Sequence, residues 1–254
     1  MNKFFTLSLI IPCYNEASRL PSSDFISFAE ENPGYNICFV NDGSTDNTAE
    51  LLAALVKQHP ENMSLISYAE NKGKAEAVRT GINTILNSEQ KTDYIGFWDA
   101  DLSTPLCEVR KFIDVLNTQY DIDIVVGSRW QHLGAKIQRK TFRGLAAKFV
   151  SIIISKYLSI PIYDSQCGAK IFRSKDAILI FQDEFVSRWL FDVEIFKRTM
   201  IINSVCYPEE HIYELPVSQW IEMGNSKLKF YHIFKILSEL IRIFSYYRKY
   251  GQTT

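Results

Sequence analysis

The sequence predicts an α/β fold, a three-layer α/β/α arrangement around a central, mainly parallel sheet. The first observation is that apolar runs of strand length alternate with amphipathic stretches of helix length through residues 7–126, as in parallel strands joined by helices on both faces. The second is that polar residues follow each apolar run, where ligands of such sheets bind, beyond the carboxyl ends of the strands. With 254 residues, 46% of them hydrophobic, the chain can bury a sizeable core, and we expect one fold.

The elements follow one another regularly in the first half of the chain. Apolar runs predict strands at residues 7–11, 37–41, 64–68, 94–98 and 122–126, and the stretches between them predict helices near residues 24–31, 48–58, 74–86 and 105–118. Ser44, Thr45 and Asp46 precede the second helix and are candidate N-caps. No internal repeat or Pro/Gly/Ser linker interrupts the chain, so we expect the later change in composition to lie inside one fold.

The charges are unevenly distributed. The 28 Lys and Arg and the 29 Asp and Glu give a net charge of −1, which offers no argument for a nucleic-acid partner, and we expect none. Residues 127–173 carry nine Lys or Arg and one acid, and residues 227–254 carry six and one. The remainder is therefore strongly acidic, which indicates an acidic half suited to a cation and a basic face suited to phosphate or membrane.

Cysteines and apolar stretches indicate the compartment. The five cysteines are an odd set without a C-x-x-C pair: Cys13, Cys38, Cys107, Cys167 and Cys206. We interpret them as reduced, mostly buried thiols of a cytoplasmic protein. The N-terminal apolar run lacks a small-residue cleavage site, so we expect no signal peptide. The longest later apolar stretch, residues 149–162, has 14 residues interrupted by Lys156. A spanning helix needs about 20, so we expect no transmembrane segment.

Two carboxylates stand one residue apart at the end of the fourth predicted strand. Asp99-Ala100-Asp101 follows the apolar run at 94–98 and precedes a predicted helix. Carboxylates at this spacing can share a hard divalent cation, which typically holds the phosphates of a nucleotide. The alternative is a pair of helix-capping residues.

Two further loops follow predicted strands. Asp42, in the segment VNDGSTD at 40–46, is an acceptor-only carboxylate suited to a base or ribose, and the alternative is an ordinary Asx turn. The loop Asn71-Lys72-Gly73-Lys74 offers cations on a flexible backbone, with a solvated basic turn as the alternative.

Taken together, these motifs resemble a known enzyme family. LIIPCYNE at 9–16, VNDGSTD at 40–46, NKGKA at 71–75, DAD at 99–101 and GSR at 127–129 are similar, in order and spacing, to the family 2 glycosyltransferases, which have a GT-A fold. DSQCGAKIF at 164–172, FDVE at 191–194 and WIEMGNSKL at 220–228 resemble the dolichyl-phosphate β-glucosyltransferases and related polyprenyl-phosphate glycosyltransferases. The resemblance covers residues 7 to about 230.

The resemblance assigns the first half of the chain to a nucleotide-sugar donor. Pro12, Asn15, Glu16 and Lys72 would line the nucleotide pocket, Asp42 would contact the base, and Asp99 and Asp101 would bind Mg²⁺ or Mn²⁺ at the diphosphate. UDP-glucose is favoured as donor, with GDP-mannose as the alternative. Related lipid-phosphate transferases often carry Gln where this chain has Ser103, a weaker ligand that we leave out of the metal set.

A phosphate acceptor would explain the basic second half. A phosphate monoester is already ionised near neutral pH, so its attack on a sugar needs positioning and charge compensation more than a strong base. Arg129, Arg139, Arg143 and Lys227 are candidates for gripping phosphate oxygens. The alternative for a single arginine is surface solvation.

Two groups of acids have different expected roles. Asp164 is the only acid in the basic stretch at 127–173, and we expect it to orient the sugar or the acceptor, with a structural salt bridge to an arginine as the alternative. Asp192 or Glu194 would act as general base if the acceptor were a sugar hydroxyl. Cys167 is expected to pack in the interior, since inverting transfer needs no covalent intermediate.

Two segments combine cations with apolar and aromatic residues. Residues 140–162 and 227–250 suit helices at an anionic membrane surface, and the alternative is that their apolar stripes face the core. We therefore divide the chain into a catalytic domain at 1–226 and a basic amphipathic helix at 227–254. Peripheral attachment to the cytosolic face of a membrane would use both segments or a membrane-bound partner protein.

The favoured function is an inverting, metal-dependent glycosyltransferase that moves a hexose from a nucleotide sugar onto a polyprenyl or dolichyl phosphate. One alternative is transfer to a saccharide hydroxyl during glycan assembly. Another is a non-catalytic module that binds a nucleotide sugar or a membrane.

Overall fold

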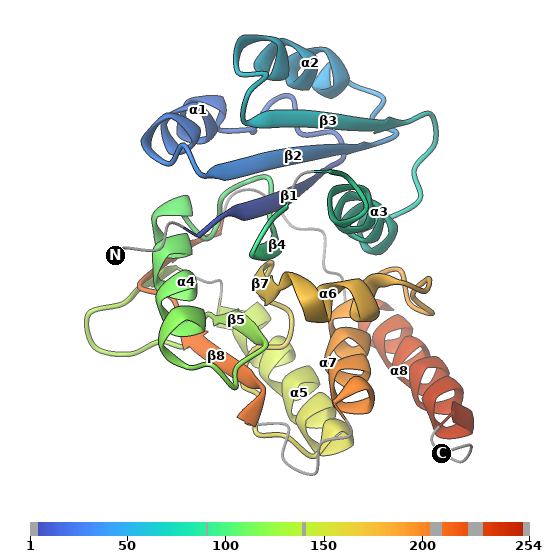
Figure 1. Ribbon diagram of the computed structural model, residues 1–254. Coiled ribbons are helices and arrows are strands. Elements are labelled where there is room, and N and C mark those ends of the chain that lie inside the picture. The colour runs from blue at the N-terminus through green and yellow to red at the C-terminus, as the bar shows by residue number, and fades with distance from the viewer. Residues whose placement is uncertain (1–4, 90, 139–140, 204–209, 223–230, 251–254) are drawn as a thin grey trace.

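A seven-stranded, mainly parallel sheet runs through the centre of the structure, which is a computed structural model (Figure 1). Its strands, in spatial order, are β3 (Met63–Tyr68), β2 (Tyr35–Asp42), β1 (Leu7–Cys13), β4 (Tyr94–Trp98), β7 (Ala169–Arg173), β5 (Ile124–Ser128) and β8 (Ile212–Pro216). Strand β7 is antiparallel to both neighbours, and the other pairs are parallel. A small parallel pair joins β6 (Lys136–Gln138) to β9 (Gln219–Ile221). The α/β class and the mainly parallel sheet predicted from sequence are confirmed.

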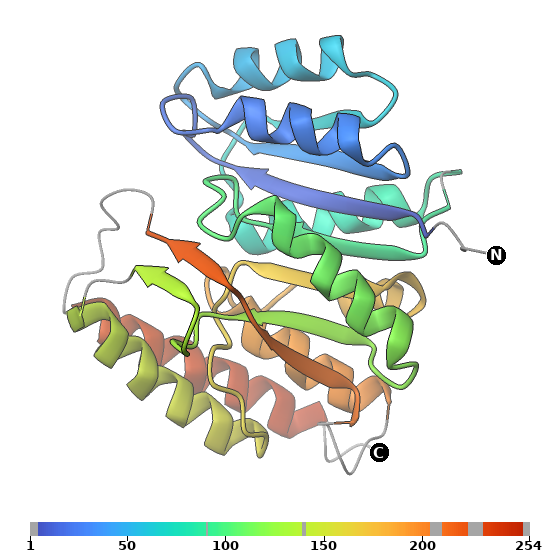
Figure 2. The same ribbon diagram turned by 90° about the vertical axis from the view of Figure 1, so that its left-hand side faces the viewer.

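The helices form a layer on each face of the sheet (Figure 2). One layer holds α1 (Ser22–Glu31), α2 (Thr48–Gln58) and α4 (Val109–Thr118), and the other holds α3 (Lys74–Leu86), α5 (Thr141–Leu158), α6 (Ser174–Phe181), α7 (Phe191–Ile202) and α8 (Tyr231–Tyr250). The structure describes residues 5–89, 91–138, 141–203, 210–222 and 231–250, with backbone alone for 141–149, 231–235 and 249–250. Each layer buries its own apolar cluster against the sheet.

The predicted elements of the first half are present with small shifts at their ends. The fifth strand begins at Ile124 rather than at residue 122, and the fourth helix opens with a 3-10 turn at Leu106–Glu108. Helix α1 begins at Ser22, two residues before the predicted start. Shifts of this size are usual at element ends, because terminal turns fray and do not have a full set of hydrogen bonds.

The three candidate N-caps of α2 have different roles in the structure. Helix α2 begins at Thr48, and the Asp46 carboxylate accepts the Thr48 backbone N–H at 3.0 Å. Ser44 and Thr45 instead bond to the loop after β1: the Asn15 N–H donates to Ser44 Oγ at 3.0 Å, and the Thr45 N–H donates to Asn15 Oδ1 at 2.8 Å. The N-cap position itself is occupied by Asn47, whose side chain forms no capping hydrogen bond. The capping prediction is therefore wrong for Ser44, Thr45 and Asp46, since Asp46 lies one residue before the N-cap.

Helix α8 packs on the same apolar cluster as α7. Leu240, Ile243 and Tyr247 are buried, and the Tyr247 hydroxyl donates to Glu194 at 3.0 Å. Burial of each such side chain contributes about 1.5–3 kcal/mol. One face of α8 therefore belongs to the core, as the alternative reading of its apolar stripe expects, while Ile241 is 64% exposed on the other face.

Candidate functional site

The carboxyl ends of β1 and β2 are joined by hydrogen bonds between the loops that follow them. Asn15 has a positive φ of 55°, and its side chain and N–H bind the turn at Ser44 and Thr45. Asparagine tolerates this left-handed conformation better than most residues, because its short amide bonds to nearby backbone. Pro12 lies within β1 beside this loop. Two of the residues assigned to the nucleotide pocket therefore lie at the expected edge of the sheet.

Asp42 is held by the loop that precedes α3. Its carboxylate accepts the N–H of Lys72 at 2.7 Å, the N–H of Gly73 at 2.8 Å and the side-chain amide of Asn71 at 3.0 Å. Burial raises the pKa of Asp42, and the two backbone hydrogen bonds only partly oppose that rise. A carboxylate has about four acceptor positions, so capacity for one further donor remains. The Lys72 ammonium lies 4.6 Å from the centre of the Tyr68 ring.

Asp99 follows β4 and forms an ion pair with Lys74 at the start of α3. Lys74 Nζ lies 2.5 Å from Asp99 Oδ1, and the Asp99 side chain is 39% exposed. Desolvation acts to raise the pKa of Asp99, but Lys74, helped by Arg129 and Lys170, outweighs it and lowers the pKa. A Cβ on Gly168 would overlap this carboxylate. Glycine at 168 therefore leaves the space that the Asp99 side chain occupies.

Asp101 has less positive compensation than Asp99. Its carboxylate accepts the Ser103 N–H at 3.0 Å, and the nearest Arg19 nitrogen is 3.8 Å away. Burial, followed by the charge of Asp99, raises the pKa of Asp101. Burial also raises the pKa of Glu16, with further contributions from Asp101 and Asp99, although Glu16 is paired with Arg19. Three acids therefore share a region that a further cation would stabilise.

The donor set at Asp99 and Asp101 fits a hard divalent cation. Carboxylate oxygens are the ligands that Mg²⁺ and Mn²⁺ prefer, and Mg²⁺ is usually held by one or two carboxylates with phosphate and water completing the shell. Among the described residues, no group of three or more His, Cys, Asp or Glu side chains is arranged to hold a metal. A cation here would thus need oxygen ligands from a bound phosphate or from water.

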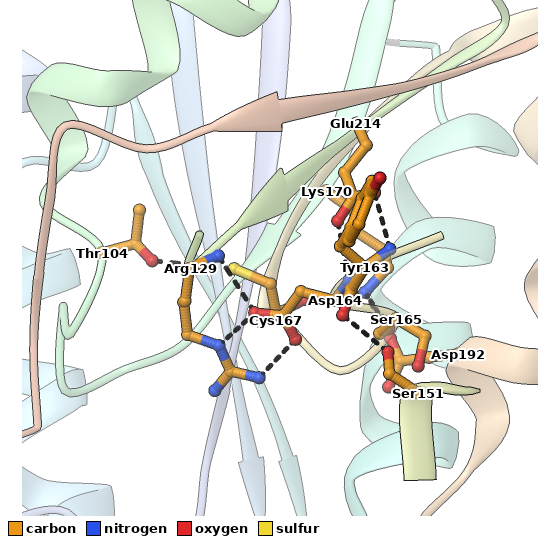
Figure 3. Close-up of polar contacts among 10 residues, drawn as sticks. All are labelled: Thr104, Arg129, Ser151, Tyr163, Asp164, Ser165, Cys167, Lys170, Asp192 and Glu214. Carbon is orange, nitrogen blue, oxygen red and sulfur yellow. Dashed lines mark hydrogen bonds and ion pairs between the residues drawn. The ribbon is translucent and has the colours of Figure 1, made fainter. Parts of the chain in front are cut away.

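Arg129, directly after β5, forms a two-pronged ion pair with Asp164 (Figure 3). Its Nε and Nη2 donate to the two carboxylate oxygens at 2.5 and 2.6 Å, and its backbone N–H donates to Asp164 at 3.0 Å. Burial acts to lower the pKa of Arg129, but the Asp164 carboxylate outweighs it and raises the pKa. The salt-bridge alternative for Asp164 is therefore present in the structure. The guanidinium also lies 5.3 Å from the Trp220 ring.

Buried Lys170 supports the loop that carries Asp164. The Lys170 side chain is 0% exposed, and its Nζ donates to Asp192 Oδ1 at 2.6 Å, to the Cys167 carbonyl at 2.7 Å and to the Ser165 carbonyl at 3.2 Å (Figure 3). A buried ammonium is stable only when its donors are satisfied. Lys170 thereby fixes the backbone between Asp164 and the glycine that faces Asp99.

Glu214 on β8 holds the same loop from its other end. Its carboxylate accepts the N–H of Tyr163 at 2.8 Å and the N–H of Asp164 at 2.7 Å, and Ser151 Oγ donates to the Tyr163 carbonyl at 2.7 Å. Neither Glu214 nor Lys170 was among the site residues predicted from the sequence. Each is a charged residue within an otherwise apolar strand. This pattern could have indicated a buried, paired charge, because charged side chains are rarely buried without partners.

The two acids expected to serve a hydroxyl acceptor are both engaged. Asp192 is buried in its ion pair with Lys170. Glu194 is 0% exposed and accepts the N–H groups of Val186 and Ser187 at 3.0 and 2.7 Å, as well as the Tyr247 hydroxyl. Burial raises the pKa of Glu194. Both carboxylates are therefore buried and hydrogen-bonded, and the charge of Asp192 also acts on Lys74, the partner of Asp99.

The cysteines of the described residues are unpaired. Cys13, Cys38 and Cys167 are buried and Cys107 is exposed. Burial raises the pKa of the Cys167 thiol, which disfavours a thiolate nucleophile. Its sulfur lies 3.9 Å from Thr104 Oγ1, in agreement with a packing role.

Three of the predicted phosphate-binding residues lie outside the side chains that the structure describes. Arg139 and Lys227 lie outside the described residues, and Arg143 lies on α5 where only the backbone is described. Cys206 is also outside the described residues.

Helices α5 and α8 contact each other and expose apolar side chains. The rings of Tyr157 and Phe244 stack with centroids 3.5 Å apart, while Ile152 is 60% exposed on α5 and Ile241 is exposed on α8. In the part of the chain that the structure describes, none of the helices is both long and apolar enough to span a membrane.

Comparison with known proteins identifies relatives for nearly the whole chain. The family described as "Glycosyl transferase family 2" matches residues 8–179. Dolichyl-phosphate beta-glucosyltransferases are similar to this chain in Trichomonas vaginalis (33% identity, 95% of this chain and 71% of the relative), Dictyostelium discoideum (32%, 93% and 73%) and Saccharomyces cerevisiae (32%, 87% and 69%).

A solved structure shares the fold. Glucosyl-3-phosphoglycerate synthase from Mycobacterium tuberculosis, in complex with Mn²⁺, UDP-glucose and phosphoglyceric acid, superposes with a TM-score of 0.63 at 15% identity. The match covers 93% of this chain and 79% of that one. The GT-A architecture expected from the sequence motifs is thereby confirmed.

Proposed function

This chain belongs to the family 2 glycosyltransferases and is a hexosyltransferase, and from that premise we propose that it transfers glucose from UDP-glucose to a polyprenyl or dolichyl phosphate. The relatives' names supply the acceptor class. The observation that carries the proposal is that Asp192 and Glu194 are both engaged in buried contacts. A hydroxyl acceptor would need one of them as a base, whereas a phosphate acceptor arrives already ionised.

In the proposed reaction, an oxygen of the acceptor phosphate attacks the anomeric carbon and inverts its configuration. The bond from that carbon to the diphosphate breaks, and the electron pair leaves with UDP. A divalent cation held by Asp99 and Asp101 would neutralise the charge that grows on the leaving group. Lys74 adds a positive charge beside Asp99.

Asp164 and Arg129 would orient the acceptor side of the site. Their ion pair fixes the guanidinium with Nε and Nη2 occupied, while a guanidinium has five N–H donors in total. Two N–H groups on Nη1 are therefore available for a phosphate oxygen, since no described residue accepts a hydrogen bond from Nη1. Asp42, with Pro12, Asn15, Glu16 and Lys72, would hold the nucleoside.

The proposed acceptor is a lipid, so the protein would meet a membrane surface. The exposed faces of α5 and α8 include Ile152, Ile241 and Tyr246. Lys156, Arg242 and Arg248 are exposed on the same two helices. Such faces bind anionic interfaces through buried apolar area and electrostatic attraction. We therefore propose peripheral attachment to the cytosolic face, with a membrane-bound partner protein as an additional anchor.

A donor and acceptor panel tests the proposal. UDP-glucose, UDP-galactose and GDP-mannose are each supplied with Mg²⁺ or Mn²⁺ and a short polyprenyl phosphate, a polyprenol or a free sugar. We expect product only with UDP-glucose and the phosphate acceptor. Asp101→Asn should lower turnover by on the order of 100-fold, since one lost electrostatic contact at a transition state costs that much.

The matched control is Asp121→Asn, an exposed aspartate before β5, which should leave turnover unchanged. If Asp101→Asn turned over at the wild-type rate, the assignment of Asp101 as a metal ligand would be wrong. Product with polyprenol or free sugar but not with the phosphate would replace the acceptor by a hydroxyl and bring Asp192 and Glu194 back as bases.

A further inference from the structure

The connection between α6 and α7, residues 182–190, lies between the start of α3 and α8 (Figure 1). On the α3 side, the Asn83 amide donates to the Phe181 carbonyl at 2.8 Å, and Arg79 Nη1 donates to the Gln182 carbonyl at 3.1 Å. The start of the connection is therefore fixed to α3, the helix whose preceding loop holds Asp42.

Arg188, within this connection, packs along Gly73 of that loop. A Cβ on Gly73 would lie 3.6 Å from the Arg188 Cβ and 3.7 Å from its Cγ and Cδ. The Gly73 N–H in turn donates to Asp42 at 2.8 Å. Gly73 has a φ of +96°, a conformation that side-chain-bearing residues rarely adopt, so the loop can present its N–H to Asp42 while Arg188 covers its Cα.

The charge of Arg188 acts on Asp42, against the effect of burial. It is among the effects that lower the pKa of Asp42, whereas the leading charges that lower the pKa of Asp99 are those of Lys74, Arg129 and Lys170. Arg188 is exposed, and no described residue forms a hydrogen bond or salt bridge with its guanidinium. The N–H donors of the Arg188 guanidinium are thus available near Asp42, the residue proposed to hold the nucleoside.

The residue before Arg188 is fixed by two other helices. The Ser187 N–H donates to Glu194 of α7 at 2.7 Å, and Ser187 Oγ donates to Glu239 of α8. Ser187 Oγ also accepts the N–H of Leu190 at 2.7 Å. Arg188 therefore directly follows a buried serine whose hydrogen bonds fix the backbone at this point. This limits the directions in which the exposed Arg188 side chain can extend.

We propose that Arg188 is a nucleoside-binding residue, whose guanidinium donates hydrogen bonds to base or ribose oxygens of the donor beside Asp42. Ser187, which is anchored by its hydrogen bonds to Glu194 and Glu239, positions Arg188. The inference rests on the proposed nucleotide-sugar donor, and it adds a recognition residue from the second half of the chain to a pocket otherwise built from the first half.

Calorimetric titration of UMP in the absence of divalent cation tests the assignment, because UMP has the nucleoside but no diphosphate. Arg188→Ala should weaken UMP binding about tenfold, the size expected for loss of a hydrogen bond from a charged donor. Arg188→Lys should recover part of that loss. Arg110→Ala, an exposed arginine on α4, should bind as the wild type does.

Each other outcome has a distinct meaning. Equal UMP affinity in Arg188→Ala and wild type would overturn the inference and leave the proposed function intact. A loss seen with UDP but not with UMP would move the contact to the phosphates and overturn the nucleoside assignment. If the wild type binds none of UMP, UDP and GDP, the donor class itself fails.

A double-mutant cycle tests the positioning role of Ser187. Ser187→Ala should weaken UMP binding about threefold in the wild-type background and have no further effect in Arg188→Ala, since residues that act through one contact are not additive. Thermal unfolding of each variant records any loss of stability. An equal loss of affinity in both backgrounds would show that Ser187 acts without Arg188.

Discussion

Lys170 Nζ lies 2.6 Å from Asp192 Oδ1, and both side chains are buried behind the loop that carries Asp164. The pair joins β7 to α7, and the same ammonium donates to two carbonyls of that loop. A charge pair thus replaces an apolar contact in the core, directly behind the proposed acceptor site.

Lys170→Met leaves the Asp192 carboxylate buried without its cation. Removal of one partner from a buried ion pair costs about 3–5 kcal/mol, so the urea midpoint should fall sharply. Lys170→Met/Asp192→Asn should unfold at a higher urea concentration than Lys170→Met alone. Lys57→Met, at an exposed position of α2, is the control and should change stability by less than about 0.5 kcal/mol. A wild-type midpoint in Lys170→Met would show that the pair does not form.

Gly168→Ala places a methyl group where the Asp99 carboxylate lies. We expect Asp99 to be displaced and Mn²⁺ affinity, measured by electron paramagnetic resonance with UDP present, to fall by on the order of tenfold or more, as for loss of one charged contact. Gly34→Ala is the matched control, because its nearest atom would be an ordinary 3.6 Å away. Unchanged Mn²⁺ binding in Gly168→Ala would exclude Asp99 as a ligand.

Asp176 should make the stability of the protein depend on pH. Burial, followed by the charge of Asp123, raises its pKa from 3.8 to about 6. The folded state then binds this proton more tightly than the unfolded state does. The stabilising contribution of protonated Asp176 is complete below about pH 4 and is lost as the pH rises through about 6.

Asp176→Asn should remove that dependence and stabilise the protein at pH 7 by on the order of 1–2 kcal/mol. Urea unfolding of variant and wild type at pH 4.5 and pH 7 measures the difference in stability at each pH. Asp121→Asn is the exposed control. If the difference between variant and wild type were the same at both pH values, Asp176 would titrate near its ordinary pKa.

The exposed face of α5 and α8 should govern vesicle binding. Ile152→Asp/Ile241→Asp adds two negative charges to this face, and we expect the fraction bound to anionic vesicles to fall severalfold, since apolar area and anionic attraction are both reduced. Ile178→Asp, at an exposed position of α6, is the control. Equal sedimentation of the double variant and wild type with vesicles would place the membrane contact elsewhere.

The part of the site at the strand ends could be predicted from sequence. Asp42, Asp99 and Arg129 each follow an apolar run, and a parallel sheet brings such positions to one edge. The two-pronged pairing of Arg129 with Asp164 could only be left as an alternative, because partner choice between distant loops depends on the order of strands and not on local pattern.

Other features depended on tertiary context. Strand β7 lies between β4 and β5 although it follows both in the chain, and no periodicity encodes that insertion. The apolar stripe of α8 has the same appearance whether it faces protein or lipid, and in the structure Ile243 faces the core while Ile241 is exposed. Lys170 carries a charge within an apolar strand, and its partner Asp192 is 22 residues away.

The antiparallel course of β7 has a consequence for the precision of the site. Side chains alternate between the two faces of a strand, so a slip of one residue in pairing exchanges the faces. Lys170 is paired with Phe97 on β4 and Val126 on β5. A slip would turn its ammonium toward the α1, α2 and α4 layer and break its hydrogen bonds to the carbonyls of Ser165 and Cys167. The register of β7, which is paired with an antiparallel strand on each side, therefore determines whether Lys170 supports the loop that carries Asp164.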